Sequence, residues 1–368
     1  MAIDRRGLLL GSGAVVLSHG LAAEERCNGD LFASASREAS GGYAAVTYGE
    51  GCGVRHRVGL PARGHDLVLR PGTPECVVFA RRPGTFAVAF SADGSTSPVE
   101  FQSQSDRHFF GHGAFSRDGR LLFTSENDFE AARGVIGVRD ATAGYRQIGE
   151  LDAGGMEPHD MCLLSDARTL VVANGGLETH PLSERENLNV ATMEPSLVYV
   201  DIETGDLLET YRLPTALHKL SIRHLALARS DLVCFGCQYQ GPVGEHPALI
   251  GFHKRGDALH LLEAGMNVYR PMHNYVGSVS VDEAGELIAA SSPRGGVAII
   301  IDVTARRVID ERRLDDVCGL APRHAGGGFL LTSGLGVVEA WSRDGVEHAP
   351  PHRENLAWDN HAISFRLA

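Results

Sequence analysis

A segment pattern that recurs seven times along the chain restricts the folds open to this sequence. Each copy opens on a short apolar strand, and most copies then reach a polar turn, such as residues 116–119, and a second apolar strand. The copies start at residues 65, 112, 159, 224, 277, 318 and 361, so the intervals between them are 47, 47, 65, 53, 41 and 43 residues. Repeats of about 40–50 residues with four short strands each are typical of β-propellers. The long third interval indicates an insertion at residues 175–195.

The two ends of the sequence predict how such a ring closes. The last copy, residues 358–365, supplies only one strand before the sequence stops. Three apolar segments before the first copy, at residues 31–35, 43–48 and 54–60, supply the strands that this copy lacks. A closing blade shared between the C-terminal strand and the N-terminal strands leaves no open sheet edge. The sequence therefore predicts an all-β protein, a seven-bladed β-propeller within residues 24–368.

Residues 1–23 are predicted to form a twin-arginine signal peptide. Arg5 and Arg6 precede a short apolar run that ends at Leu17, and small residues follow as far as Ala23. A paired arginine before such a run and a small-residue cleavage site is typical of this export route. The run is shorter than the ~20 apolar residues of a membrane-spanning helix, and no other segment approaches that length. We therefore expect a periplasmic protein without a membrane span.

Charge and cysteine content narrow the choice of partners. A formal net charge of −12 argues against nucleic acid and anionic membranes as partners and suits cations or neutral molecules. Seven cysteines would leave at least one thiol unpaired in an oxidised monomer. Cys234 and Cys237 form a lone Cys-x-x-Cys pair, which is compatible with a disulfide, a redox pair or two buried thiols.

Five of the seven copies begin with a histidine: His65, His112, His159, His224 and His361. In a four-stranded antiparallel blade, the loop that enters the innermost strand and the loop between the second and third strands lie on the same face. The second kind of loop carries charged and amide side chains, so we expect these groups and the imidazoles to converge at one mouth of the channel. A histidine at this register can instead stabilise its own blade. The companion loops differ between blades, which favours a functional site.

Neutral imidazole is a ligand for iron, copper and zinc. Opposite members of a seven-fold ring are expected to lie about 10 Å or more apart, so two or three neighbouring blades must supply the ligands. We favour His112, His159 and His224, with His65 and His361 as further candidates. Glu126 or Asp160 could complete a set of two histidines and one carboxylate, and Cys318 would add a soft ligand. Because bound histidines are deprotonated, metal affinity is expected to fall below about pH 6.5.

Other residues of the same loops suggest a second kind of ligand. Arg82 and Arg294 favour an anion, because a guanidinium group binds carboxylate or phosphate with two hydrogen bonds. The candidate residues for binding an anionic ligand are Arg82, Glu126, Asn174, Gln238 and Arg294.

Six short stretches carry a resemblance to a known family, namely residues 108–113, 124–128, 172–176, 223–225, 292–296 and 358–361. They resemble a family of twin-arginine-exported bacterial proteins of the type called domain of unknown function 1513. The resemblance spans nearly the whole chain after the signal peptide. It implies a periplasmic seven-bladed propeller that is often encoded beside imelysin-type iron-uptake proteins, and it brings no reaction with it.

These expectations combine into one hypothesis and two alternatives. The hypothesis is a periplasmic propeller that binds a transition metal or a metal–anion complex in a histidine-lined funnel and serves iron acquisition, with periplasmic iron-uptake proteins as partners. Iron is the expected metal, and copper or zinc would suit the same ligands. A lactonase-like, metal-dependent hydrolase would use the same funnel, so catalysis remains open. The other alternative is a protein-interaction platform with the insertion at 175–195 as its contacting arm.

Overall fold

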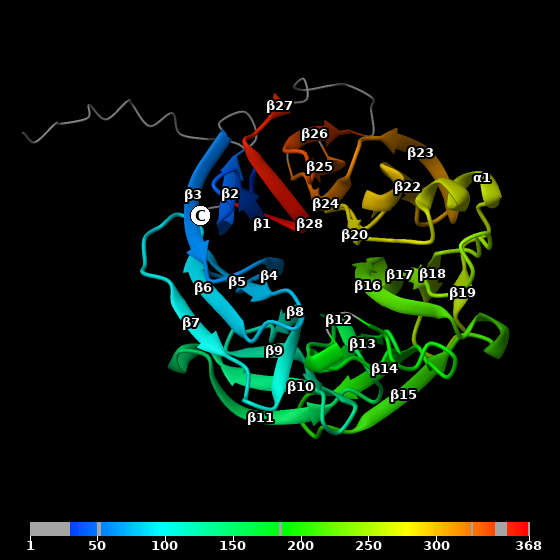
Figure 1. The fold of residues 1–368 in the computed structure, drawn as a ribbon, viewed down its shortest axis with the longest axis horizontal. Coiled ribbons are helices and arrows are strands. Elements are labelled where there is room, and N and C mark those ends of the chain that lie inside the picture. The colour runs from blue at the N-terminus through cyan, green and yellow to red at the C-terminus, as the bar shows by residue number, and fades with distance from the viewer. Residues whose placement is uncertain (1–29, 50–52, 184–185, 325–326, 343–351, 367–368) are drawn as a thin grey trace, which may run out of the picture.

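Seven four-stranded sheets form a ring around a central channel (Figure 1). The computed structural model describes residues 30–49, 53–183, 186–324, 327–342 and 352–366. All strand pairs in the sheets are antiparallel, as alternating up-and-down strands require. The predicted seven-bladed β-propeller is confirmed. The predicted signal peptide, residues 1–23, lies outside the described residues.

The closing blade joins the two ends of the chain as the sequence predicts. Its strand order is β28-β1-β2-β3, formed by β28 (Leu356–Phe365), β1 (Leu31–Glu38), β2 (Tyr43–Gly49) and β3 (Gly53–Leu60). The pairing runs from Leu31 opposite Phe365 to Glu38 opposite Leu356. In Figure 1 the red strand β28 lies beside the dark blue strands of the N-terminal segment. The innermost strand of this blade is therefore the last strand of the chain.

Each of the other six blades is built from four consecutive strands. The second and third blades contain β4 (Gly64–Leu69), β5 (Glu75–Ala80), β6 (Phe86–Ser91) and β7 (Val99–Gln102), then β8 (Arg107–Phe115), β9 (Leu121–Asp128), β10 (Arg133–Asp140) and β11 (Arg146–Asp152). The fourth and fifth contain β12 (Pro158–Leu163), β13 (Thr169–Asn174), β14 (Ser196–Asp201) and β15 (Leu207–Arg212), then β16 (Leu220–Ala228), β17 (Leu232–Tyr239), β18 (Ile250–His253) and β19 (His260–Leu261). The sixth and seventh contain β20 (Ser278–Val281), β21 (Leu287–Ser292), β22 (Val297–Asp302) and β23 (Arg307–Arg313), then β24 (Val317–Pro322), β25 (Phe329–Ser333), β26 (Val337–Trp341) and β27 (His352–Arg353).

Helices are short and confined to the connections. The described part of the chain contains α1 (Met266–Tyr269) and the 3₁₀ turns η1 (Ala141–Ala143), η2 (Pro181–Ser183), η3 (Thr215–Leu217), η4 (Arg229–Asp231), η5 (Arg270–Met272) and η6 (Pro293–Gly295). None of the helices within these residues is long and apolar enough to cross a membrane. The predicted insertion is the connection between β13 and β14, so it lies at the same end of its blade as the start of β12.

The core lies between neighbouring blades. Each middle strand is apolar on both faces, so its side chains pack against the sheets on either side. Phe79 of β5, for example, meets Phe109 of β8 edge to face, with ring centroids 6.1 Å apart. This packing fixes the seven innermost strands around the channel, where the predicted site lies.

Candidate metal centre in the channel

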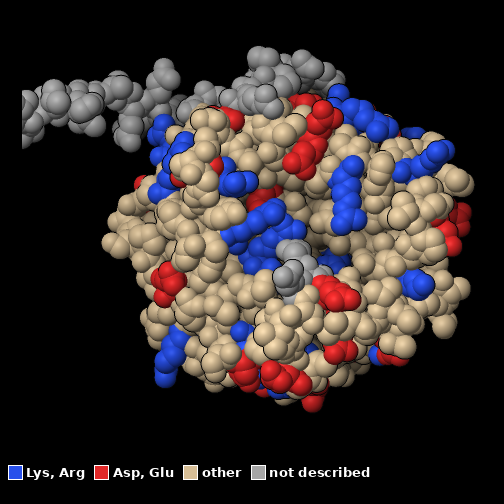
Figure 2. Space-filling view, viewed as in Figure 1, with Lys and Arg blue, Asp and Glu red and all other residues tan. Residues whose placement is uncertain are grey.

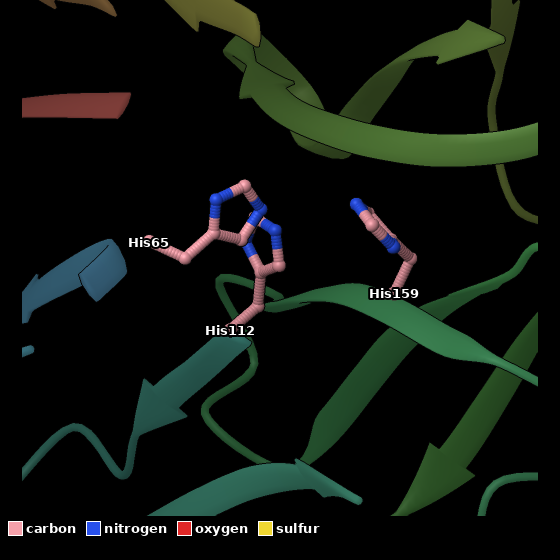
Figure 3. A group of neighbouring side chains, drawn as sticks. All are labelled: His65, His112 and His159. Atoms are coloured by element: carbon pink, nitrogen blue, oxygen red, sulfur yellow. The ribbon is translucent and has the colours of Figure 1, made fainter. Parts of the chain in front are cut away.

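Five histidines from five blades meet on the axis of the channel. They belong to the innermost strands β4, β8, β12, β16 and β28 and are all buried: His65, His112, His159, His224 and His361. Successive rings around this arc have centroids 4.8–5.0 Å apart. His112 and His361 lie two blades apart, yet their centroids are 4.8 Å apart. The expected separation of about 10 Å across the ring is therefore wrong, because the imidazoles reach inward and close the channel. Figure 3 shows His65, His112 and His159 pointing into the same central space.

Irregular pairing of the innermost strands turns these side chains toward the axis. The register shifts between Gly64 and Leu67 around His65, between Phe109 and Gly113 around His112, between Pro158 and Asp160 around His159, and between Ile222 and His224. Strand β28 has a similar shift opposite Ser34 and Ser36. A bulge of this kind bends a strand and changes the direction of a side chain.

One glycine makes room for the cluster. Gly111 has a φ of +107°, and a Cβ atom there would lie 2.5 Å from Cδ2 of His65. Only glycine combines that backbone conformation with such a close approach. The bulge beside His112 and the ring of His65 therefore depend on the glycine at position 111.

Carboxylates fix the orientation of two rings. Nδ1 of His112 lies 2.9 Å from Oδ2 of Asp66 and 3.6 Å from Oδ1 of Asp160. Nδ1 of His65 lies 3.3 Å from Oδ1 of Asp359, whose other oxygen accepts from Arg63 at 2.5 Å. Because an ionised carboxylate only accepts hydrogen bonds, each Nδ1 carries the proton and each Nε2 presents its lone pair. Carboxylate–histidine pairs of this kind orient metal ligands.

Several ring nitrogens of the cluster lack a hydrogen-bond partner among the described residues. These buried atoms are Nε2 of His112, both ring nitrogens of His224 and Nε2 of His361. His159 differs, because Nη1 of Arg223 lies 3.4 Å from its Nδ1. A guanidinium group can only donate, so this contact engages the lone pair of His159 and leaves the proton on Nε2.

Two groups of three histidines bring one ring nitrogen per residue within 4.8 Å of one another. The first is His65, His112 and His159, and the second is His112, His224 and His361. Each residue of the second group carries a buried ring nitrogen without a hydrogen-bond partner among the described residues, so this group has lone pairs to offer to an ion. Its composition differs from the trio His112, His159 and His224 that the sequence favours. A third group, Asp66, His112 and Asp160, is the hydrogen-bonded set behind His112.

Burial keeps the histidines neutral. It lowers the pKa of His361 to about 4 and lowers the pKa of His65, His159 and His224 well below the usual 6.5. The pKa of His112 is lowered for the same reason. Neutral imidazole is the form that binds a metal ion.

The carboxylates respond in two ways. Burial raises the pKa of Asp160 to about 6 and also raises that of Asp66. At Asp359, burial alone would raise the pKa, but the hydrogen bond from His65 and the charge of Arg63 hold it well below its usual range. Asp359 therefore remains the fixed negative charge of the cluster.

A polar cavity of about 220 Å³ lies at the mouth of the channel, with His65, His159 and His224 among its lining residues. Its walls bring together Arg81, Arg82, Arg223, Arg294 and Gln238. Figure 2 shows Lys and Arg side chains gathered around the central hollow. Of the predicted anion-binding residues, the structure thus places Arg82, Gln238 and Arg294 in one cavity.

Glu126 and Asn174 lie away from this cavity. Strand β9 extends through Asp128, so Glu126 is part of a strand and not of a loop. Its Oε1 accepts from Nη2 of Arg139 at 2.9 Å and from Thr124 at 2.6 Å inside the blade. The amide of Asn174 donates to the Ala153 carbonyl at 2.8 Å. Glu126 therefore stabilises its own blade, and Asn174 links its strand to the segment that follows β11 of the preceding blade.

Among the described residues, no cysteine adds a ligand to the cluster. Sγ of Cys318 faces the carbonyl oxygens of Trp358 and Thr332 at 3.4 and 3.5 Å. Cys234 and Cys237 are buried free thiols, so of the three possibilities for this pair the structure has two buried thiols. Burial raises the pKa of all three thiols, which keeps them protonated.

The sequence analysis did not single out Asp66, Arg223 or Asp359 as part of the site. Two signals could have found Asp66 and Arg223. A His-Asp dipeptide occurs in two copies of the repeat, at His65-Asp66 and His159-Asp160, and an Arg-His dipeptide opens the fourth copy. Residues next to a bulged position share its displacement toward the axis, so these neighbours were candidates too.

Comparisons with known proteins support the fold and the family. Hydrazine synthase of Kuenenia stuttgartiensis has a similar structure, with a TM-score of 0.54, 14% sequence identity and 70% of each chain covered. At that identity the likeness shows the fold alone. No curated protein matches the sequence. The model of a family described as "protein of unknown function (DUF1513)" matches residues 58–365, most of the chain, so this protein belongs to the DUF1513 family.

Proposed function

We propose that this protein binds a transition-metal ion in the channel through His112, His224 and His361. Two observations carry the proposal: these three buried residues have ring nitrogens without a hydrogen-bond partner among the described residues, and one ring nitrogen from each lies within 4.8 Å of the others. A buried polar atom without a partner costs about 1–3 kcal/mol. A metal ion would bind one nitrogen from each ring at once. A purely structural role of the histidines does not explain why these buried nitrogens have no partner among the described residues.

The geometry requires only a small closure around the ion. The three nitrogens lie within 4.8 Å of one another, and metal–nitrogen bonds of about 2.0–2.1 Å place donors roughly 3–4 Å apart. Rotation of the imidazoles by small angles would bring them together. Asp66 and Asp160 would hold the proton on Nδ1 of His112, which makes its Nε2 a better donor.

The proposal extends to iron, with periplasmic iron acquisition as the setting and residues 1–23 as the export signal. The support for iron is the resemblance of the six quoted stretches to exported proteins often encoded beside iron-uptake proteins. Three neutral imidazoles also suit copper and zinc. Metal loading is therefore compared across Fe(II), Cu(II) and Zn(II), and a preference for copper or zinc would remove iron from the proposal while leaving the metal site.

Metal analysis of untagged protein tests this function. Wild-type protein should hold about one equivalent of metal, and His361→Gln should lose it while its thermal unfolding without metal stays cooperative. His260→Gln is the matched control, because His260 is exposed on β19 at the edge of a blade. Wild-type protein that binds no metal after loading, or His361→Gln protein that retains it in full, would contradict the proposal.

A further inference from the structure

The cavity at the channel mouth has an excess of positive charge. Four arginines line it, and no Asp or Glu is among its described lining residues. Arg82 and Arg223 share one buried carboxylate beside the cavity, that of Glu157, at 3.5 and 2.9 Å. In a protein with a net charge of −12, four gathered arginines indicate a site for a negatively charged molecule.

Two of these arginines have no ionic partner among the described residues. The side chain of Arg81 makes no hydrogen bond or ion pair with them, and the guanidinium of Arg294 lies over the ring of Tyr275, 4.3 Å from its centroid. Burial lowers the pKa of Arg81 and Arg82, and neighbouring arginines lower it further, while the charges of Asp359 and Glu157 act in the opposite direction. The crowding of like charge is the electrostatic cost that a bound anion would relieve.

The arginines lie on different sides of the opening. Arg81 and Arg82 follow β5, whereas Arg223 belongs to β16 and Arg294 to η6, which follows β21. Figure 1 shows β5 across the ring from β16. Arg82 and Arg223 already reach one carboxylate, that of Glu157, so we expect a ligand that engages Arg81 and Arg294 as well to carry more than one anionic group.

We propose that this cavity binds a small polycarboxylate, a di- or tricarboxylate held by Arg81 and Arg82 at one end and by Arg294 at the other. Guanidinium groups pair with carboxylates through two hydrogen bonds. The amides of Gln238, Asn274 and Asn360 in the same lining can bind further oxygens. The inference goes beyond the metal site and does not depend on it.

Calorimetric titration of metal-depleted, full-chain protein tests the ligand class. The probes are citrate and tricarballylate as tricarboxylates, and inorganic phosphate and acetate as compact anions. We expect both tricarboxylates to bind at least tenfold more tightly than phosphate or acetate. Phosphate binding as tight as that of citrate would overturn the polycarboxylate assignment, and so would the absence of citrate binding.

Substitutions at the exposed edge of the cavity test the arginines without risk to folding. Arg294→Gln should weaken citrate binding by roughly ten- to a hundredfold, the usual effect of losing hydrogen bonds to a charged group. Arg313→Gln is the matched control, since Arg313 lies on the outer strand β23 with its side chain 59% exposed. Unchanged citrate affinity in Arg294→Gln, or an equal loss in the control, would overturn the role of Arg294.

The same variants separate this inference from the proposed metal site. His361 is not among the lining residues of the cavity, so His361→Gln should lose metal and keep citrate. Arg294→Gln should lose citrate and keep metal. Citrate binding by a protein that never takes up metal would refute the metal proposal alone, and metal binding without citrate binding would refute this inference alone.

Discussion

Five blades place a histidine on the axis of the channel, and two blades do not. At the corresponding positions, Gly277 directly precedes β20 and Cys318 lies in β24, yet both of these blades have four complete strands. A histidine is therefore dispensable for forming a blade of this propeller. The comparison argues against the structural reading of the repeated histidines, in which each one stabilises its own blade.

The two blades without histidines also shape the cluster. His224 and His361 lie three blades apart around the ring, yet their centroids are 4.9 Å apart. Short side chains at the two intervening positions leave the axis free, so these two rings approach each other directly. Both rings carry unpartnered nitrogens, and we place the ion between these two rings and that of His112.

Deletion of β28 should have the largest effect, because it removes a strand as well as an imidazole. The strand buries Leu356, Trp358 and Phe365, each worth about 1.5–3 kcal/mol, and net stabilities are only about 5–15 kcal/mol. Protein lacking residues 356–368 should show no cooperative thermal transition by circular dichroism. A melting curve like that of the wild type would refute the closure of the ring by this strand.

Removal of the His112 imidazole, which both histidine triads contain, should abolish metal binding. His112 belongs to each histidine triad. Mutation of a residue that only hydrogen-bonds a metal ligand typically weakens metal affinity by roughly 10–100-fold. We expect His112→Ala, which removes a ligand itself, to weaken it by more than that. His159→Gln is the informative counterpart, because Arg223 already engages this ring, and it should change affinity less than tenfold. Competition titrations with a chromophoric chelator measure both, and a larger loss in His159→Gln would favour the other triad.

The lowered pKa values predict how stability depends on pH. Between about pH 4, the pKa of His361 in the fold, and the usual 6.5 the unfolded chain binds protons that the folded histidines refuse, so stability should rise with pH. Asp66 and Asp160 have raised pKa values and act in the opposite sense, Asp160 between 3.8 and about 6, but these two carboxylates are outnumbered by the five histidines. Urea midpoints should increase from pH 4.5 to 6.5 and then level off. A flat or falling midpoint over that range would mean that the histidines are not buried as neutral groups.

The same burial changes the expected pH dependence of metal binding. The sequence suggests a loss near pH 6.5, whereas imidazoles that protonate only far below this value should keep their ion at pH 5.5. Metal content after dialysis at pH 7.5 and 5.5 measures the difference. Complete loss at pH 5.5 would show that the ligands titrate like exposed histidines.

The smallest effect is expected in one of the blades without a histidine. Oγ of Ser278 lies 3.4 Å from Nδ1 of His361, which is at the limit of a hydrogen bond. Ser278→Ala should therefore cost no more than about 0.5–1.5 kcal/mol of unfolding free energy and leave metal content unchanged. Loss of metal in this variant would place the gap, and not the histidine arc, at the centre of the site.

The propeller and the histidine arc could be predicted from sequence because both follow from a repeat. Apolar strands at regular intervals determine the blades, and a residue at a fixed register recurs at the axis. The state of each ring nitrogen could not be predicted, because it depends on bulges and on partners from other blades, such as Arg223 beside His159. Glu126 illustrates the same limit. We expected it in a loop, but β9 continues through Asp128, which places its side chain inside the blade beside Arg139.

X-ray absorption spectroscopy of the metal-loaded protein tests the central claim most directly, because it reports the atoms bonded to the ion. We predict a first shell that contains three imidazole nitrogens at about 2.0–2.1 Å, with the outer-shell scattering of histidine rings, and a loss of one imidazole in His361→Gln. A first shell made only of oxygen atoms, or one that contains sulfur, would contradict binding by His112, His224 and His361.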